Sequence, residues 1–195
     1  MSGMSVSAAI MAGGKSRRMG QDKAWIELDG QPLIRRVADV LAQVADEVII
    51  VANDPRYAAL GLRVVPDRFP EGGALGGIAT GVGAATFDRV LVAACDMPFL
   101  SVEVWRVLLD HRYDGDVVIP KLGNDLETLH ALYTKTCVAP MERALAMGKM
   151  RVISFFDEVR VQTIEESELR VADPTLRSFT NVNTPEELAA ALLLP

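Results

Sequence analysis

Short apolar runs rich in β-branched residues alternate along the chain with segments whose apolar residues recur at helical spacing. Such alternation is typical of βαβ units that build a mainly parallel sheet. The predicted strands are residues 6–11, 48–52, 62–65, 89–94, 116–119, 129–133, 152–156 and 159–164. The predicted helices are residues 32–44, a segment beginning near Leu75, residues 102–109, residues 136–147 and a C-terminal helix. We therefore predict a three-layer α/β fold with a mainly parallel sheet and a small antiparallel addition at 129–133.

Local signals define several ends of these elements. Pro120 is expected to end the strand at 116–119. Ser101 is the expected N-cap of the helix at 102–109. For the C-terminal helix we expect a capping box formed by Thr184 and Glu187, with Pro185 as the first helical residue.

Composition limits the possible classes of protein. The chain has 195 residues, half of them hydrophobic, which suits a single domain spanning residues 1–195. A net charge of −6 argues against nucleic-acid binding. No apolar run is long enough for a membrane span, and no cation precedes the apolar residues 6–11 as it would in a signal peptide. Cys95 and Cys137 lack the spacing of a disulfide framework or zinc site. We expect a cytoplasmic protein that binds neither nucleic acid nor membrane.

The segment 11–23, MAGGKSRRMGQDK, follows the first predicted strand and contains a Gly-Lys-Ser triplet. It does not match a P-loop, because that motif needs a glycine where the chain has Ala9. The adjacent Gly13 and Gly14 allow the backbone to approach a ligand and point N–H groups at phosphate oxygens. Further donors and positive charge come from Ser16, Arg18 and Lys23. We interpret this loop as a phosphate-binding site; the alternative is a solvated surface turn.

The sequence CDMP at 95–98 follows the strongest predicted strand. Asp96 therefore lies at the edge of the sheet where ligands bind, and its carboxylate oxygens suit Mg²⁺. The alternative role for such an aspartate is a helix cap or turn, but Ser101 is the better cap. Cys95 is expected to lie in the core.

Polar residues follow three other predicted elements. Asn53 and Asp67 each come just after a strand and have groups that can bind a base or ribose, although both also suit turns. The glycines at 72–77, including Gly76, either admit a flat ligand or allow tight helix packing. Asn181 and Asn183 point the same way if their segment is extended; local capping is the alternative. The two histidines, His111 and His130, lack metal-ligand spacing and are expected to be structural.

Five motifs follow one another along the chain: AGGKSRRMGQDK, VVPD, EGGALGGI, CDMPFL and NVNTPEEL. In these motifs and their order the chain resembles the molybdenum cofactor guanylyltransferases, a branch of the Rossmann-like nucleotidyltransferases. The resemblance extends from the first strand to the last helix. It implies transfer of GMP from GTP to the terminal phosphate of molybdenum-bound molybdopterin, with release of pyrophosphate. It further implies Mg²⁺ as cofactor and, as partners, other molybdenum cofactor biosynthesis proteins and molybdoenzyme chaperones.

The resemblance also assigns residues. Met11, Ala12 and Gly13 match backbone contacts to the nucleotide, and Lys23 matches the cation on its phosphates. The remaining matches are Asn53 and Asp67 at the nucleotide, Asp96 at Mg²⁺, and Asn181 and Asn183 at the pterin. The phosphate loop adds Gly14, Ser16 and Arg18, and the carbonyls near Met11 and Gly76 are candidate acceptors for guanine. Lys23, Arg18 and Asp96 are the predicted catalytic residues.

One departure concerns Glu127 and Thr128, which occupy the place of a His-Pro pair that is usual in the family. Two rival functions remain open. The first is a cytidylyltransferase of the same fold, against which Ala12-Gly13-Gly14 argues because the cytidylyl branch tends to have Ala-Ala-Gly. The second is a non-catalytic nucleotide-binding regulator, which would have no need of both Lys23 and Asp96.

Overall fold

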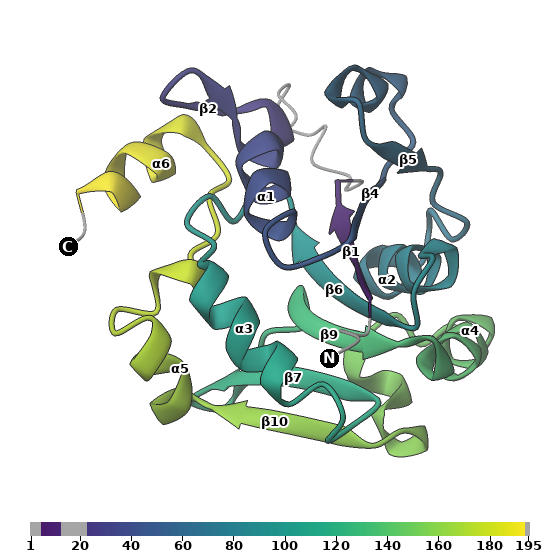
Figure 1. Cartoon of the computed structure of the whole chain (residues 1–195). Coiled ribbons are helices and arrows are strands. Elements are labelled where there is room, and N and C mark those ends of the chain that lie inside the picture. Colours follow the sequence, from purple (N-terminus) through teal and green to yellow (C-terminus); the bar gives the residue numbers. More distant parts are fainter. Residues whose placement is uncertain (1–4, 13–22, 194–195) are drawn as a thin grey trace.

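The computed structural model describes residues 5–12 and 23–193, and most of its strands form one central sheet (Figure 1). The strand order is β10-β7-β9-β6-β1-β4-β5, and β8 pairs with β7 beside this path. The bounds are β1 Val6–Met11, β4 Glu47–Val51, β5 Arg63–Val65, β6 Arg89–Ala94, β7 Val117–Leu122, β8 Asp125–Leu126, β9 His130–Thr134 and β10 Val161–Glu165. A separate antiparallel pair consists of β2 Glu27–Leu28 and β3 Gln31–Pro32.

The direction of the strands fits a mainly parallel sheet. β6, β1, β4 and β5 are parallel neighbours, and β10 is parallel to β7. β9 lies antiparallel between β6 and β7, as predicted for residues 129–133. The short β8 is also antiparallel, so the antiparallel addition comprises β8 and β9.

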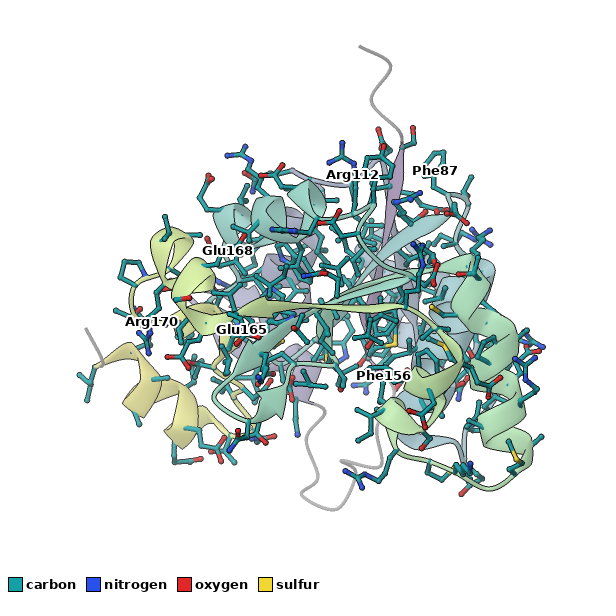
Figure 2. All side chains as sticks on the ribbon, turned by 90° about the horizontal axis from the view of Figure 1, so that it is seen from below. Phe87, Arg112, Phe156, Glu165, Glu168 and Arg170 are labelled. Carbon is teal, nitrogen blue, oxygen red and sulfur yellow. The ribbon has the colours of Figure 1, made fainter. Side chains whose placement is uncertain are left out.

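Helices cover both faces of the sheet and complete three layers (Figure 1). α1 Leu33–Leu41, α3 Val102–Asp110 and α5 Glu166–Ala172 cover one face, and α2 Gly73–Ala84 and α4 Val138–Ala146 cover the other. Alternate residues of β1 contribute to different cores: Ala8 and Ile10 pack with α1 and α3, whereas Ala9 packs with α2. Figure 2 shows side chains filling the space on both sides of the sheet. The predicted three-layer fold is confirmed.

The strand predicted at 152–156 is wrong, because Val152–Glu158 forms a 3₁₀ helix, η5. Val152 and Phe155 are buried three residues apart while Ile153 is exposed. This three-residue repeat belongs to a 3₁₀ helix, whereas a strand would repeat every two residues. The backbone N–H of Ser154 donates to the carbonyl of Arg151 at 3.0 Å, which closes the first turn.

The end predicted at Pro120 is also wrong, since β7 continues to Leu122. β9 pairs with β7 only at Val117 and Val118, so the antiparallel pairing requires no N–H at position 120. The carbonyl of Pro120 still accepts a hydrogen bond from the N–H of Glu127 at 3.0 Å. Proline is tolerated here because only its acceptor is used.

The C-terminal helix α6 Pro185–Leu192 packs on the β2–β3 hairpin, in a small core that includes Val182. The Thr184 side chain accepts a bond from the N–H of Glu187 at 3.1 Å, as predicted. The Glu187 carboxylate, however, accepts from the N–H of Asn183 at 2.7 Å, so the predicted box is only half formed. The N–H of Val182 donates to the carbonyl of Asp96 at 2.8 Å. This bond joins residues 181–183 to the loop after β6.

No helix within residues 5–12 and 23–193 combines the length and apolar character required to cross a membrane.

Candidate active site

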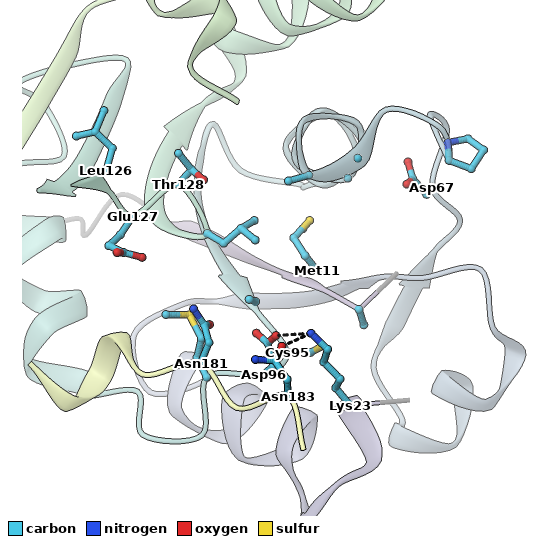
Figure 3. Close-up of a pocket in the computed structure, with 18 of the residues that line it drawn as sticks. Met11, Lys23, Asp67, Cys95, Asp96, Leu126, Glu127, Thr128, Asn181 and Asn183 are labelled. Atoms are coloured by element: carbon cyan, nitrogen blue, oxygen red, sulfur yellow. Dashed lines mark hydrogen bonds and ion pairs between the residues drawn. The ribbon is translucent and has the colours of Figure 1, made fainter. Parts of the chain in front are cut away.

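A pocket of about 700 Å³ opens at the carboxyl ends of β1 and β6 (Figure 3). Ligands of open α/β sheets bind at this edge, beyond the ends of the parallel strands. The pocket is lined by the end of β1, the loop after β6, the first turns of α2, the segment joining β8 to β9, and the segment before α6. The fold thus brings together residues that lie far apart in the sequence.

Asp96, which follows β6, lines this pocket. Its Oδ1 is buried without a hydrogen-bond partner among the described residues, and its Oδ2 lies 3.5 Å from Nζ of Lys23. Ser101 caps α3 by accepting a bond from the N–H of Glu103, as predicted, so Asp96 is not used as the cap. The Asp96 carboxylate therefore has one oxygen available to a ligand.

Lys23 begins the 3₁₀ helix η2 Lys23–Trp25 and points toward Asp96 (Figure 3). Its Nζ donates a hydrogen bond to Oδ1 of Asn183. The Nδ2 of Asn183 in turn donates to the Glu187 carboxylate at 3.0 Å. Hydrogen bonds from the backbone and side chain of Asn183 lower the pKa of Glu187. Asn183 is thus fixed from two sides and holds the lysine beside the carboxylate.

Asn181 and Asn183 both line the pocket, on either side of the buried Val182. This agrees with the prediction that they face the same way on an extended segment. The side-chain amide of Asn183 is already hydrogen-bonded to Lys23 and Glu187, whereas the Asn181 amide has no hydrogen bond to another described residue. Their contact with a pterin stays a prediction.

Asn53 and Asp67 are linked to each other. The Oδ1 of Asn53 accepts from the N–H of Asp67 at 2.9 Å. The Oδ1 of Asp67 accepts from the N–H of Phe69 at 2.9 Å and from the hydroxyl of Thr80 at 3.0 Å. Asp67 lines the pocket, whereas Asn53 is not among the lining residues and holds the backbone of Asp67 through its bond to the Asp67 N–H. Asp67 therefore lies where a ligand in the pocket can reach it, and Asn53 positions the backbone of Asp67.

The glycine segment lies along α2, where Gly73 and Gly77 line the pocket but Gly76 does not. A Cβ at Gly76 would lie 2.5 Å from the carbonyl oxygen of Phe69, so this glycine allows the helix to pack closely on residue 69. The carbonyl of Gly76 accepts from the Thr80 hydroxyl at 2.9 Å. Gly76 therefore allows tight helix packing, whereas Gly73 and Gly77 lie where a ligand in the pocket could approach the backbone.

Met11 and Ala12 line the pocket where β1 ends. The carbonyl of Met11 accepts from the N–H of Cys95 at 3.2 Å, and that of Ala12 accepts from the Tyr57 hydroxyl at 3.1 Å. The end of β1 is thereby fixed on both sides. Outside the described residues lie Gly13, Gly14, Ser16 and Arg18, whose roles stay predictions.

Sequence reasoning did not select Glu127 as a site residue, although it noted the departure from His-Pro. Glu127 and Thr128 lie between β8 and β9 and line the pocket (Figure 3). Burial, and secondarily the charge of Asp125, raise the pKa of the Glu127 carboxyl. Cys95, expected in the core, packs against the core and also lines the pocket.

Both histidines are structural, as expected. His130 is buried between the rings of Trp105 and Phe179, and burial lowers its pKa to about 3. His111 lies on the surface, where its ring nitrogens hydrogen-bond to the carboxylates of Glu168 and Asp114, which raises its pKa. The part of the chain that the structure describes contains no group of three or more His, Cys, Asp and Glu side chains able to hold a metal ion.

The chain is similar to characterised families over nearly its whole length. Residues 8–161 match the family model of the MobA-like NTP transferase domain. A probable molybdenum cofactor guanylyltransferase of Pelotomaculum thermopropionicum is 42% identical over 192 residues, which cover 98% of this chain and 94% of that protein. A molybdenum cofactor guanylyltransferase of Desulfosudis oleivorans is 40% identical over 189 residues, covering 95% and 94%.

Solved structures show the same fold. The crystal structure of molybdopterin-guanine dinucleotide biosynthesis protein A from Archaeoglobus fulgidus has a TM-score of 0.80 at 28% identity, covering 95% of this chain and 96% of that one. A 4-diphosphocytidyl-2C-methyl-D-erythritol synthase from Anaerococcus prevotii has a TM-score of 0.71, covering 97% and 95%, at 19% identity, which shows a shared fold alone.

Proposed function

The chain belongs to the family of MobA-like NTP transferases, and we propose that it transfers GMP from GTP to the terminal phosphate of molybdenum-bound molybdopterin. The products are molybdopterin guanine dinucleotide and pyrophosphate. The observation that carries this proposal is the pairing of Lys23 with Asp96 at the centre of a pocket at the carboxyl edge of the sheet. In this pair Lys23 is the cation that would bind phosphates, and Asp96 is the carboxylate that would bind a metal ion.

The reaction forms a bond from an oxygen of the molybdopterin phosphate to the α-phosphorus of GTP and breaks the bond from that phosphorus to the β-phosphate oxygen. The attacking oxygen is already anionic, so no general base is required. The protein must instead offset repulsion between two phosphates and stabilise the negative charge on the departing pyrophosphate. Lys23 supplies positive charge for both tasks, and Arg18 is proposed to assist it.

Asp96 fits a Mg²⁺ ion. Its buried Oδ1 has no hydrogen-bond partner among the described residues, and a hard cation would satisfy it. A single carboxylate suffices because Mg²⁺ in such sites takes its other ligands from water and substrate phosphates. When bound, the ion would neutralise charge on the phosphates.

The two substrates are proposed to approach from opposite ends of the pocket. Asp67 and the first turns of α2 form one end, where we place the guanine and ribose. Asn181 and the β8–β9 segment form the other end, where we place the pterin (Figure 3). Lys23 and Asp96 lie between the two ends, where the phosphates must meet. The further partners that we propose are other molybdenum cofactor biosynthesis proteins and molybdoenzyme chaperones, in the cytoplasm.

The test measures pyrophosphate release with each of the four nucleoside triphosphates in the presence of molybdenum-bound molybdopterin. Guanine donates from N1–H and the 2-amino group, and cytosine would leave acceptors of a guanine site unpaired at about 1–3 kcal/mol each. Two such losses total at least about 2 kcal/mol and so favour GTP over CTP by at least about 30-fold in kcat/KM. A preference for CTP would replace the guanylyl assignment with a cytidylyl one. Nucleotide binding without any pyrophosphate release would identify a non-catalytic regulator.

A further inference from the structure

The Glu127 carboxylate faces the pocket without a hydrogen bond from any described residue. The side chain is only partly exposed, and burial together with Asp125 raises its pKa. A partly desolvated carboxylate without a donor is unfavourable, because it has lost water and gained nothing in return. A ligand that offers N–H groups would remove this cost.

The backbone around Glu127 is held firmly. Its N–H donates to the carbonyl of Pro120, and its own carbonyl accepts from the N–H of His130, each at 3.0 Å. The carbonyl of Thr128 accepts from the Tyr133 hydroxyl at 2.8 Å. The turn therefore presents the side chain from a fixed position, which is the arrangement expected of a binding residue supported by its surroundings.

Glu127 lies at one end of the pocket and Asp67 at the other, with Lys23 and Asp96 between them in the view of Figure 3. In the same view Asn181 lies on the Glu127 side of Asp96. If the phosphates meet at Lys23, a group that reaches Glu127 must belong to the substrate opposite the nucleotide base. The apolar side chains of Leu126 and Leu129 flank this end and suit the faces of a flat ring.

We propose that Glu127 binds the pterin ring by accepting two hydrogen bonds, from the ring N3–H and the 2-amino group, and so determines specificity for the acceptor substrate. The 2-amino-4-oxopyrimidine edge of a pterin presents these two donors side by side, and the two oxygens of a carboxylate match them. This inference rests on the proposed function, because it takes the acceptor to be a molybdopterin.

The matched substitutions are Glu127→Gln and Asp125→Asn. Glu127→Gln keeps the size of the side chain but turns an NH₂ group toward a donor of the ring. The loss of one charge-assisted hydrogen bond predicts a rise of about 10- to 100-fold in KM for molybdopterin, with the Kd for GTP unchanged. Asp125→Asn removes the neighbouring exposed charge without touching the pocket lining, and we expect a change of less than about threefold. Thermal unfolding of both variants reports any loss of folding.

A second measurement isolates the hydrogen bonds themselves. A 6-substituted pterin and the matching lumazine, in which an oxo group replaces the 2-amino group, are compared as competitors of molybdopterin. The wild type is expected to prefer the pterin by about tenfold, and Glu127→Gln is expected to lose this preference. An unchanged preference in a folded Glu127→Gln variant would overturn the inference, as would an equal weakening of GTP and molybdopterin. Failure of the wild type to form the dinucleotide would instead overturn the proposed function.

Discussion

Lys23 donates a hydrogen bond to Asn183, a residue 160 positions further along the chain, and this contact aims the lysine at Asp96. The Asn183 amide cannot turn freely, because its nitrogen donates to Glu187. Asn183 is therefore a positioning residue for the proposed phosphate-binding lysine.

Asn183→Ala is expected to lower kcat/KM by roughly tenfold, the value of one hydrogen bond to a charged group in an exposed setting. In the proposed function the phosphates of both substrates bind near Lys23, so KM for GTP should rise as well. The comparison is Lys23→Ala, for which loss of a preorganised charge predicts a decrease of about 100- to 1,000-fold in kcat. Steady-state kinetics at several GTP concentrations measure both effects. An Asn183→Ala enzyme with wild-type kinetics would show that Lys23 does not need to be positioned by Asn183.

Asp96→Asn is expected to abolish Mg²⁺-dependent activity while the protein stays folded. The amide keeps the shape of the side chain but loses the charge that a hard cation requires. The buried Oδ1 has no donor among the described residues, so no protein hydrogen bond to that atom is lost. Activity is measured across a Mg²⁺ titration, with unfolding monitored separately. Full wild-type activity after chelation of divalent ions would contradict the assignment of Asp96 to a metal.

The central strands could be predicted from sequence because their apolar runs are buried on both faces. β1 and β6 begin and end at the predicted residues. The segment at 152–156 is equally apolar, but its buried residues Val152 and Phe155 are three positions apart, and composition alone does not distinguish that repeat from a strand. Pro120 was misjudged because β9 no longer pairs with β7 at that position, while β10 does pair with β7 there, so the strand continues through the proline.

Within the site, Asp96 was predictable because it directly follows a strongly apolar strand. The connection from Lys23 to Asn183 was not, since it depends on where α6 docks. The Asp29-Gly30 pair is a typical hairpin turn and indicates the β2–β3 hairpin, but no local pattern indicates that α6 packs on that hairpin. Glu127 was missed as a binding residue for a similar reason. It reaches the pocket because β9 inserts between β6 and β7, which is a property of the sheet and not of the local sequence.

Gly76→Ala is expected to destabilise the fold by about 1–3 kcal/mol, because the added Cβ would meet the backbone oxygen of Phe69 at 2.5 Å. Gly83→Ala, in the same helix, is the control. The nearest atoms to a Cβ there are side-chain atoms at 3.8 and 3.9 Å, so the gain in helix propensity of about 0.5–1 kcal/mol should be realised. Urea unfolding of the two variants should give changes of opposite sign. Equal stability of the two would remove the steric role of Gly76.

The last prediction concerns the dependence of stability on pH. His130 is fully buried between Trp105 and Phe179, and burial lowers its pKa from 6.5 to about 3. Below pH 6.5 the unfolded chain therefore binds a proton at this residue that the folded protein does not bind. This contribution to stability is present above pH 6.5 and is lost as the pH falls toward 3, at about 1.4 kcal/mol per pH unit.

Carboxylates such as Asp116 and Asp173, whose hydrogen bonds lower their pKa values, add to the loss at acid pH, so the wild-type curve alone does not isolate the histidine. His130→Leu removes the titrating group and keeps an apolar side chain in the core, while both carboxylates remain. Urea unfolding of wild type and variant between pH 7 and pH 4.5 gives the difference in unfolding free energy at each pH. Any excess in the unfolding free energy of the wild type over His130→Leu should decrease steadily as the pH falls. Only the wild type contains this histidine, which the unfolded chain protonates and the folded protein does not. Parallel curves would mean that His130 takes up its proton equally in the folded and unfolded chains, and the ring would then have access to water or to an acceptor in the native core.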